Sequence, residues 1–214
     1  MEHTDLTRLD LPEERTKLSN EQGGYSFYAY LSRMRYITRW GLMRNSSPEN
    51  IQEHSHMVAV LAHALGLISR EVYGNTHISP ETCATAALFH DATEIITGDM
   101  PTPVKYYSPE IREAYQKVEN VAVEQLLSML PPALRDSYIP LLKEIPLEVE
   151  KIVKAADKLS AHIKCLEELK ASNHEFILAA RQTRQALDDM NMPEVHYFID
   201  NFLDSFTLTL DELK

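Results

Sequence analysis

Glycine and regular alternation of apolar and polar residues are both scarce in this chain. It contains 6 Gly in 214 residues, and no run of alternating β-branched residues is present. Strong helix formers dominate instead, so strands are difficult to place. We therefore expect an all-α protein, long enough to bury one sizeable core in a single compact bundle.

Positive charge is also in deficit. The chain has 21 Lys and Arg against 32 Asp and Glu, which gives a formal net charge of -11. Proteins that bind the phosphate backbone of nucleic acids usually carry clustered Lys and Arg. The composition therefore argues against a nucleic-acid polymer as a partner, but it allows a small anion held by a metal and a few cations.

Cysteine and long apolar runs are rare as well. The two cysteines, Cys83 and Cys165, lie far apart in apolar helical stretches, which favours buried, reduced thiols over a disulfide framework. The longest apolar stretch, residues 57–68, is interrupted by His63 and is too short to span a bilayer. The first residues lack the basic and apolar regions of a signal peptide. We expect a cytoplasmic protein with no membrane partner.

The tripeptide Ser-Pro-Glu occurs three times, beginning at Ser47, Ser79 and Ser108, each time before a helical pattern. Serine can cap a free N–H group, proline suits the first helical position, and glutamate interacts favourably with the helix dipole. We expect a helix to begin at each tripeptide. The predicted helices cover residues 25–39, 48–73, 80–96, 109–130, 133–144, 147–171, 174–190 and 194–204. A polar N-terminal arm, residues 1–24, precedes the domain, residues 25–214.

Histidine and aspartate occur in a pattern typical of metal ligands. His90 and Asp91 are adjacent at the end of an apolar run, and Glu94 follows one helical turn later. His54 and Asp157 stand in two other apolar helical patterns, where an unpartnered polar side chain would be costly. Two imidazoles and two carboxylates suit one divalent transition metal, namely manganese, cobalt, iron, zinc or nickel.

Each of these residues also has an ordinary structural explanation. A lone histidine in a helix is more often a hydrogen-bonded core or surface residue than a ligand. Asp157 could simply pair with Lys154 or Lys158 on its own helix. It is the combination of His54, the later doublet and the distant aspartate that favours a metal site.

The segment from residue 97 to residue 103 contains one glycine and two prolines, which end helices and leave backbone groups free for a ligand. We interpret it as a candidate binding loop.

A spaced histidine, a later His-Asp doublet and a distant aspartate together resemble the HD-domain phosphohydrolases. The flanking segments resemble one branch closely, the bacterial 5'-deoxynucleotidases of the YfbR-like group. The matching segments are residues 39–40, 42–45, 53–55, 90–94, 97–106, 156–157 and 164–169. The resemblance covers residues 27–213 and implies an HD-domain helical bundle, a homodimer, and hydrolysis of nucleoside 5'-monophosphates, preferably deoxy ones, to nucleoside and phosphate.

The resemblance also implies a role for individual residues. It assigns the metal to His54, His90, Asp91 and Asp157, and it counts His54, Asp91 and Asp157 among the residues at the substrate. Trp40 would lie beside the sugar and exclude a 2'-hydroxyl, although a lone tryptophan is more often core packing. Asp99 would accept a hydrogen bond from the 3'-hydroxyl. The backbone that frames the nucleoside would be that of Asp99, Met100, Pro101 and Thr102.

Two polar residues are the candidates for the chemistry. Arg39 is predicted to orient the phosphate with its forked donors, and its ordinary alternative is a surface salt bridge. Glu94 is predicted to act as general acid or base. Its alternative is a carboxylate that orients His54 or His90.

Two other functions are compatible with the same residues. A phosphodiesterase or a deoxynucleoside triphosphate hydrolase could use the same metal core, but Arg39, Arg44 and Lys105 are few cations for three phosphates. A non-catalytic nucleotide-sensing module is the second alternative. Glu94 argues against it, because a binding module needs no proton-transfer group.

Overall fold

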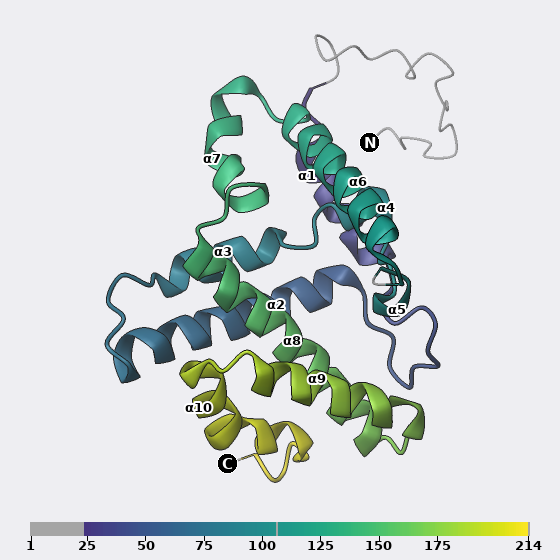
Figure 1. Cartoon of the computed structure of the whole chain (residues 1–214), viewed down its shortest axis with the longest axis vertical. Helices are drawn as coiled ribbons and strands as arrows, with labels where there is room; N and C mark the ends of the chain where they lie inside the picture. The colour runs from purple at the N-terminus through teal and green to yellow at the C-terminus, as the bar shows by residue number, and fades with distance from the viewer. Residues whose placement is uncertain (1–23, 106, 214) are drawn as a thin grey trace, which may run out of the picture.

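The computed structural model describes residues 24–105 and 107–213, and these residues form helices joined by short loops (Figure 1). The predicted polar arm, residues 1–24, lies outside the described residues apart from Gly24. The described ranges contain no β-strand, only an isolated antiparallel bridge between Thr38 and Asn50. The prediction of an all-α protein is confirmed. None of the described helices is both long and apolar enough to cross a membrane.

The α-helices, in chain order, are α1 (Phe27–Leu31), α2 (Ile51–Leu67), α3 (Pro80–Phe89), α4 (Glu94–Thr97), α5 (Thr102–Lys105), α6 (Pro109–Ser128), α7 (Pro132–Leu142), α8 (Leu147–Lys170), α9 (Ile177–Asp189) and α10 (Pro193–Phe202). The 3-10 helices are η2 (Ser32–Tyr36), η4 (His174–Phe176) and η5 (Leu203–Thr207). A π-helical turn, η3 (Ile68–Val72), continues α2.

Helices α2, α3 and α8 pack against one another at the centre, and α9 lies along α8 (Figure 1). Their shared core contains fully buried side chains such as Leu65 from α2 and Leu159 from α8. A second cluster around Phe27 and Leu126 joins α1 to α6. Burial of aliphatic side chains is the main stabilising contribution to such a bundle, so the core holds α2 and α8 in a defined register.

Cys83 and Cys165 are both buried free thiols, as predicted. Burial raises the pKa of each thiol to about 11, so both remain protonated at neutral pH.

Two of the three Ser-Pro-Glu tripeptides begin helices as predicted. The Ser79 hydroxyl accepts a hydrogen bond from the Thr82 N–H (3.1 Å) at the start of α3. The Ser108 hydroxyl accepts one from the Ile111 N–H (3.3 Å) at the start of α6. A proline stands at the first turn of each helix, where its missing N–H costs nothing.

The prediction of a helix start at Ser47 is wrong. Helix α2 begins at Ile51, because Asn50 and Glu53 form a capping box there. The Asn50 side chain accepts from the Glu53 N–H (3.0 Å), and the Glu53 carboxylate accepts from the Asn50 N–H (3.3 Å). Glu49 is therefore left outside the helix.

The predicted helix over residues 80–96 is interrupted at the His-Asp doublet. Helix α3 ends at Phe89, and turns occupy residues 90–93 before α4. In a continuous helix the Ala87 carbonyl would accept from the Asp91 N–H. It is instead close to two nitrogens of His90, the backbone N at 3.4 Å and the ring Nδ1 at 2.7 Å. This side-chain contact competes with helical pairing and breaks the helix at the doublet.

The chain between η2 and α2 forms a closed loop, residues 40–49. The Arg39 N–H donates to the Glu49 carbonyl (2.9 Å), and the Ile51 N–H donates to the Ile37 carbonyl (3.0 Å). The two ends of the 40–49 loop are therefore held side by side.

A buried polar cluster on α8 anchors this loop. The Glu168 carboxylate accepts from the N–H groups of Ser46 (2.8 Å) and Ser47 (3.2 Å), and from the side chains of Lys164 (2.5 Å) and Asn173 (2.8 Å). Burial alone would raise the pKa of Glu168, but the hydrogen bonds from Lys164 and Asn173 outweigh it and hold the pKa well below its usual range. Glu168 is thus a buried carboxylate whose charge is fully partnered.

We expect Glu168→Ala to lower the free energy of unfolding by about 3–5 kcal/mol, because it leaves the Lys164 ammonium buried without its partner. Chemical denaturation at neutral pH measures this loss. The matched control is Glu167→Ala, an exposed neighbour on the same helix, which should change stability by less than about 0.5 kcal/mol. Equal losses in the two variants would contradict the anchoring role of Glu168.

Candidate active site

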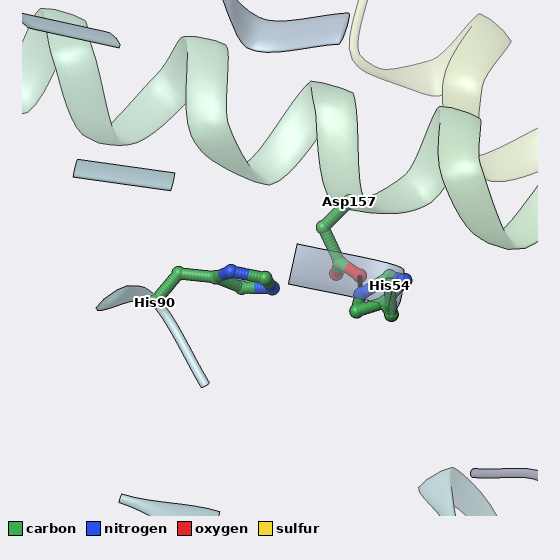
Figure 2. A group of neighbouring side chains, drawn as sticks. All are labelled: His54, His90 and Asp157. Carbon is green, nitrogen blue, oxygen red and sulfur yellow. Dashed lines mark hydrogen bonds and ion pairs between the residues drawn. The ribbon is translucent and has the colours of Figure 1, made fainter. Parts of the chain in front are cut away.

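His54, His90 and Asp157 point towards one another from α2, from the turn after α3 and from α8 (Figure 2). One ligand atom of each lies within 4.8 Å of the others. His54 Nε2 is 3.1 Å from Asp157 Oδ1. The structure therefore brings together three of the four predicted metal ligands from distant parts of the chain.

The second nitrogen of each imidazole determines which atom faces this centre. His90 Nδ1 is 2.7 Å from the Ala87 carbonyl oxygen, which can only accept, so Nδ1 donates and Nε2 is left towards the centre. His54 Nδ1 is 3.2 Å from the Ser160 hydroxyl. His90 Nε2 is buried and has no hydrogen-bond partner. A buried, unpaired nitrogen beside a second imidazole and a carboxylate fits a divalent cation.

Asp91, the fourth predicted ligand, lies at the same centre. Its Oδ2 is 3.2 Å from His90 Nε2 and 3.6 Å from His54 Nε2. The contact with His90 lacks the angles of a hydrogen bond, but the same oxygen accepts one from Arg39 Nη1 at 3.2 Å. Asp91 therefore joins the histidine cluster to the predicted phosphate-binding arginine.

Burial and charge shift the ionisation of these groups strongly. Burial alone would lower the pKa of His90, but the neighbouring charge of Asp91 outweighs it and raises the pKa to about 9. Burial would raise the pKa of Asp157, yet the hydrogen bond and charge of His54 hold it well below its usual range. A cation at this centre would compete with the proton on His90.

Glu94 is the first residue of α4, one turn after Asp91. Its Oε2 is buried without a hydrogen-bond partner. Burial raises the pKa of Glu94 to about 9, and the charges of Asp91 and Asp99 act in the same direction. Glu94 is therefore a protonated carboxyl at neutral pH, which suits a proton donor.

Arg39 is largely buried between two carboxylates and is not a surface salt bridge. Its Nη1 bonds Asp91, and its Nε donates to Glu49 Oε2 at 3.2 Å. The charges of Asp91, Asp157 and Glu49 outweigh burial and raise its pKa, so the guanidinium remains charged.

Trp40 has a strained backbone, with a positive φ of 60° that non-glycine residues rarely adopt. Its ring packs on Phe176 with the centroids 5.3 Å apart. Its Nε1–H donates to Glu49 Oε2 at 3.0 Å. The contact with Phe176 is ordinary core packing. The hydrogen bond to Glu49 links the indole to Arg39, because both residues donate to the Glu49 carboxylate.

The predicted binding loop, residues 97–103, is non-helical only at residues 98–101, because Thr97 ends α4 and Thr102 begins α5. Asp99, Met100 and Pro101 are partly buried there, and Thr102 is the exposed first residue of α5. Burial raises the pKa of Asp99, while the charge of Arg39 opposes this shift. The charge of Arg39 therefore acts on the Asp99 carboxyl.

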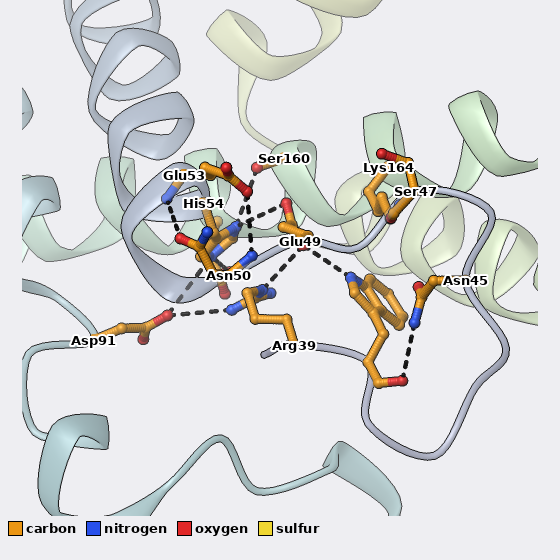
Figure 3. Close-up of polar contacts among 12 residues, drawn as sticks. Arg39, Asn45, Ser47, Glu49, Asn50, Glu53, His54, Asp91, Ser160 and Lys164 are labelled. Carbon is orange, nitrogen blue, oxygen red and sulfur yellow. Dashed lines mark hydrogen bonds and ion pairs between the residues drawn. The ribbon is translucent and has the colours of Figure 1, made fainter. Parts of the chain in front are cut away.

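Glu49 is a residue of this site that the sequence pattern did not reveal, because Ser-Pro-Glu indicated a helix start. Figure 3 shows its carboxylate between Arg39 and His54. The capping pair formed by Asn50 and Glu53 was the signal that could have placed Glu49 outside the helix.

The sequence of this chain is similar to those of known proteins. Residues 26–206 match the family described as 5'-deoxynucleotidase YfbR-like. A 5'-deoxynucleotidase of Vibrio parahaemolyticus is 49% identical over 190 residues, 88% of this chain and 97% of that protein. One from Photobacterium profundum is 50% identical over 191 residues, with the same two coverages.

Solved structures show the same fold. An HD-domain phosphohydrolase from Listeria innocua has a TM-score of 0.73 and 25% identity, covering 85% of this chain and 88% of the other. The HD phosphohydrolase of cyanophage S-2L, bound to dA and one catalytic Zn²⁺, has a TM-score of 0.58 and 22% identity, covering 83% and 96%. The family match extends over most of this chain, and the relative from Vibrio parahaemolyticus is 49% identical over 88% of it. This chain therefore belongs to the YfbR-like 5'-deoxynucleotidase family.

Proposed function

We propose that this hydrolase cleaves deoxynucleoside 5'-monophosphates to nucleoside and phosphate at the centre formed by His54, His90, Asp91 and Asp157. The observation that carries the proposal is the buried Nε2 of His90, which has no hydrogen bond, beside the two ligand atoms of His54 and Asp157. The names of the bacterial relatives and the dA and Zn²⁺ bound to the cyanophage enzyme support both the substrate and the cofactor.

The cofactor would be one divalent transition metal: cobalt, manganese, zinc, iron or nickel. Two imidazole nitrogens and two carboxylates form a donor set that suits all five. When bound, the cation would supply Lewis-acid polarisation of a phosphoryl oxygen and a water of lowered pKa. The uncatalysed reaction is among the slowest known, so both contributions matter.

Arg39 would orient the phosphate. Two of its nitrogens are held by Glu49 and Asp91, and Nη2 has no hydrogen bond to any residue that the structure describes. That nitrogen would donate to a phosphate oxygen from a fixed direction. A preorganised donor of this kind stabilises charge in the transition state without reorganisation.

Glu94 would act as the general acid. The oxygen of water bonds to phosphorus, the bond from phosphorus to the 5'-oxygen breaks, and the leaving 5'-oxygen takes the proton of the Glu94 carboxyl. One proton of the attacking water then passes to the Glu94 carboxylate, which restores the acid and leaves hydrogen phosphate. The pKa of about 9 keeps that proton in place at neutral pH. Proton donation is thus a stronger interpretation than orientation of a histidine.

Trp40 and Asp99 would select the sugar. The indole, packed on Phe176, would occupy the space that a 2'-hydroxyl needs, and Asp99 would accept a hydrogen bond from the 3'-hydroxyl. The backbone of Asp99, Met100, Pro101 and Thr102 would frame the nucleoside. Homodimer formation and a cytoplasmic location stay predictions from the family resemblance.

We expect metal-loaded protein to release inorganic phosphate from deoxynucleoside 5'-monophosphates and no triphosphate from deoxynucleoside triphosphates. His90→Ala should lower bound metal and phosphate release on the order of 100-fold or more, because it removes a ligand and not an outer contact. Elemental analysis and a phosphate assay measure both. His77→Ala, at an exposed histidine paired with Glu148, is the control and should match wild type. Normal activity in His90→Ala would rule out this centre.

Glu94→Gln should reduce kcat about 10²- to 10⁴-fold and leave the metal content unchanged, because the amide cannot supply the proton. Steady-state kinetics and elemental analysis separate the two possible roles. If Glu94 merely orients a histidine ligand, the variant will lose metal and its kcat will recover at high metal concentration.

Trp40→Ala should lower the preference for deoxyribo- over ribonucleotides about tenfold or more, because it opens space beside the sugar. The ratio of kcat/KM for matched deoxy- and ribonucleoside monophosphates measures the preference. A wild type that hydrolyses both sugars equally would refute the selectivity role but not the phosphatase activity.

A further inference from the structure

Glu49 contacts three groups of the proposed site through one carboxylate. Its Oε2 accepts from Arg39 Nε (3.2 Å) and from Trp40 Nε1 (3.0 Å). Its Oε1 lies 3.9 Å from His54 Nδ1 (Figure 3). Arg39, proposed to orient the phosphate, and Trp40, proposed to contact the sugar, therefore donate hydrogen bonds to the same oxygen atom.

The backbone holds Glu49 in this place from both sides. Its carbonyl accepts from the Arg39 N–H (2.9 Å), and the capping residue Asn50 follows directly. The far side of the 40–49 loop is bonded to the buried carboxylate of Glu168. Glu49 is only about 15% exposed, so its charge acts where water screens it weakly.

Arg39 needs this second carboxylate for a defined direction. Asp91 bonds Nη1 alone, and one hydrogen bond leaves a guanidinium free to turn about that contact. Adding the Nε bond from Glu49 fixes the plane of the guanidinium, since the two bonds lie on different nitrogens. Trp40 has a similar need, because its strained backbone does not by itself determine where the indole edge lies.

We propose that Glu49 is a positioning residue that aligns the Arg39 guanidinium on the phosphate and seats the Trp40 indole against the sugar. Phosphate orientation and sugar choice are therefore coupled through one side chain. This inference rests on the proposed function, and it deepens it by adding a residue that touches neither the metal nor the substrate.

The test is Glu49→Gln, which keeps the size of the side chain and removes its charge. Both donors bond Oε2, so an amide oxygen at that place could still accept from both, but it is a neutral acceptor and each bond loses its charge assistance. Weakening two charge-assisted hydrogen bonds corresponds to a roughly 10- to 100-fold effect. We expect kcat for the deoxynucleotide to fall by about that factor, with a smaller change in KM, and the deoxy-to-ribo ratio of kcat/KM to fall at least ~5-fold.

Trp40 supplies a readout that needs no turnover. It is the only tryptophan in the chain, so all tryptophan emission comes from this indole. Both proteins are compared without metal. Relative to the wild type, we expect Glu49→Gln to have a shifted emission maximum and faster quenching by acrylamide. If Glu49 contributed only to overall stability and did not position the indole, the folded variant would have the same emission as the wild type.

The matched control is Glu53→Gln. This residue also follows the loop and carries one negative charge. Among the residues that the structure describes, its carboxylate accepts only from the Asn50 N–H, and glutamine serves equally well in a capping box. It should behave as wild type in rate, sugar ratio and emission.

A second experiment introduces Glu49→Gln into a Trp40→Phe variant, which keeps an aromatic ring and removes the Nε1 donor. There, Glu49→Gln should still lower kcat through Arg39 but should no longer change the sugar ratio.

Unchanged emission and an unchanged sugar ratio in Glu49→Gln would overturn the inference, as would equal effects in Glu53→Gln. Absence of nucleotidase activity in the metal-loaded wild type would instead overturn the proposed function. The emission of the metal-free proteins would then still decide whether Glu49 seats the indole.

Discussion

Packing of α2 against α8 is the constraint on which the rest of this structure depends. It puts a histidine of one helix, fully buried, 3.1 Å from an aspartate of the other. Both groups would be costly in an apolar core without partners. Their mutual contact reduces that cost and creates one side of a centre that the His-Asp doublet completes from a third segment. The hydrophobic core therefore does more than stabilise the bundle, because its register determines the geometry of this candidate metal site.

The doublet reaches this centre because the helix that precedes it ends there. A continuous helix would direct His90 and Asp91 about 100° apart around its axis. The turn at residues 90–93 instead brings His90 Nε2 and Asp91 Oδ2 within 3.2 Å. The contact of the His90 ring with the Ala87 carbonyl both ends the helix and sets the direction of the other nitrogen. One hydrogen bond thus determines both where α3 ends and which nitrogen of His90 faces the centre.

Acidic and basic side chains alternate around the centre. Arg39 lies between Glu49 and Asp91, and Asp91 lies between Arg39 and the histidines. Each charge is partly compensated by its neighbour, which allows several ionised groups to coexist in a largely buried site. Two buried atoms are exceptions, because no described residue forms a hydrogen bond with Glu94 Oε2 or His90 Nε2. Departures from full pairing often mark the groups that act on a ligand.

Much of this could be predicted from residue order alone. Helix starts at Ser79 and Ser108, the all-α class and the buried thiols depend on patterns within one or two helical turns, and the candidate metal ligands were chosen by their kinds of donor atom. The tertiary structure decided the rest. Only packing brings together His54 and Asp157, which are 103 positions apart. Only loop closure with the Asn50 cap places Glu49 outside the helix, as the partner of Arg39 and Trp40. Local patterns cannot specify such contacts, because they arise between segments whose positions are set by the core and not by their neighbours in the chain.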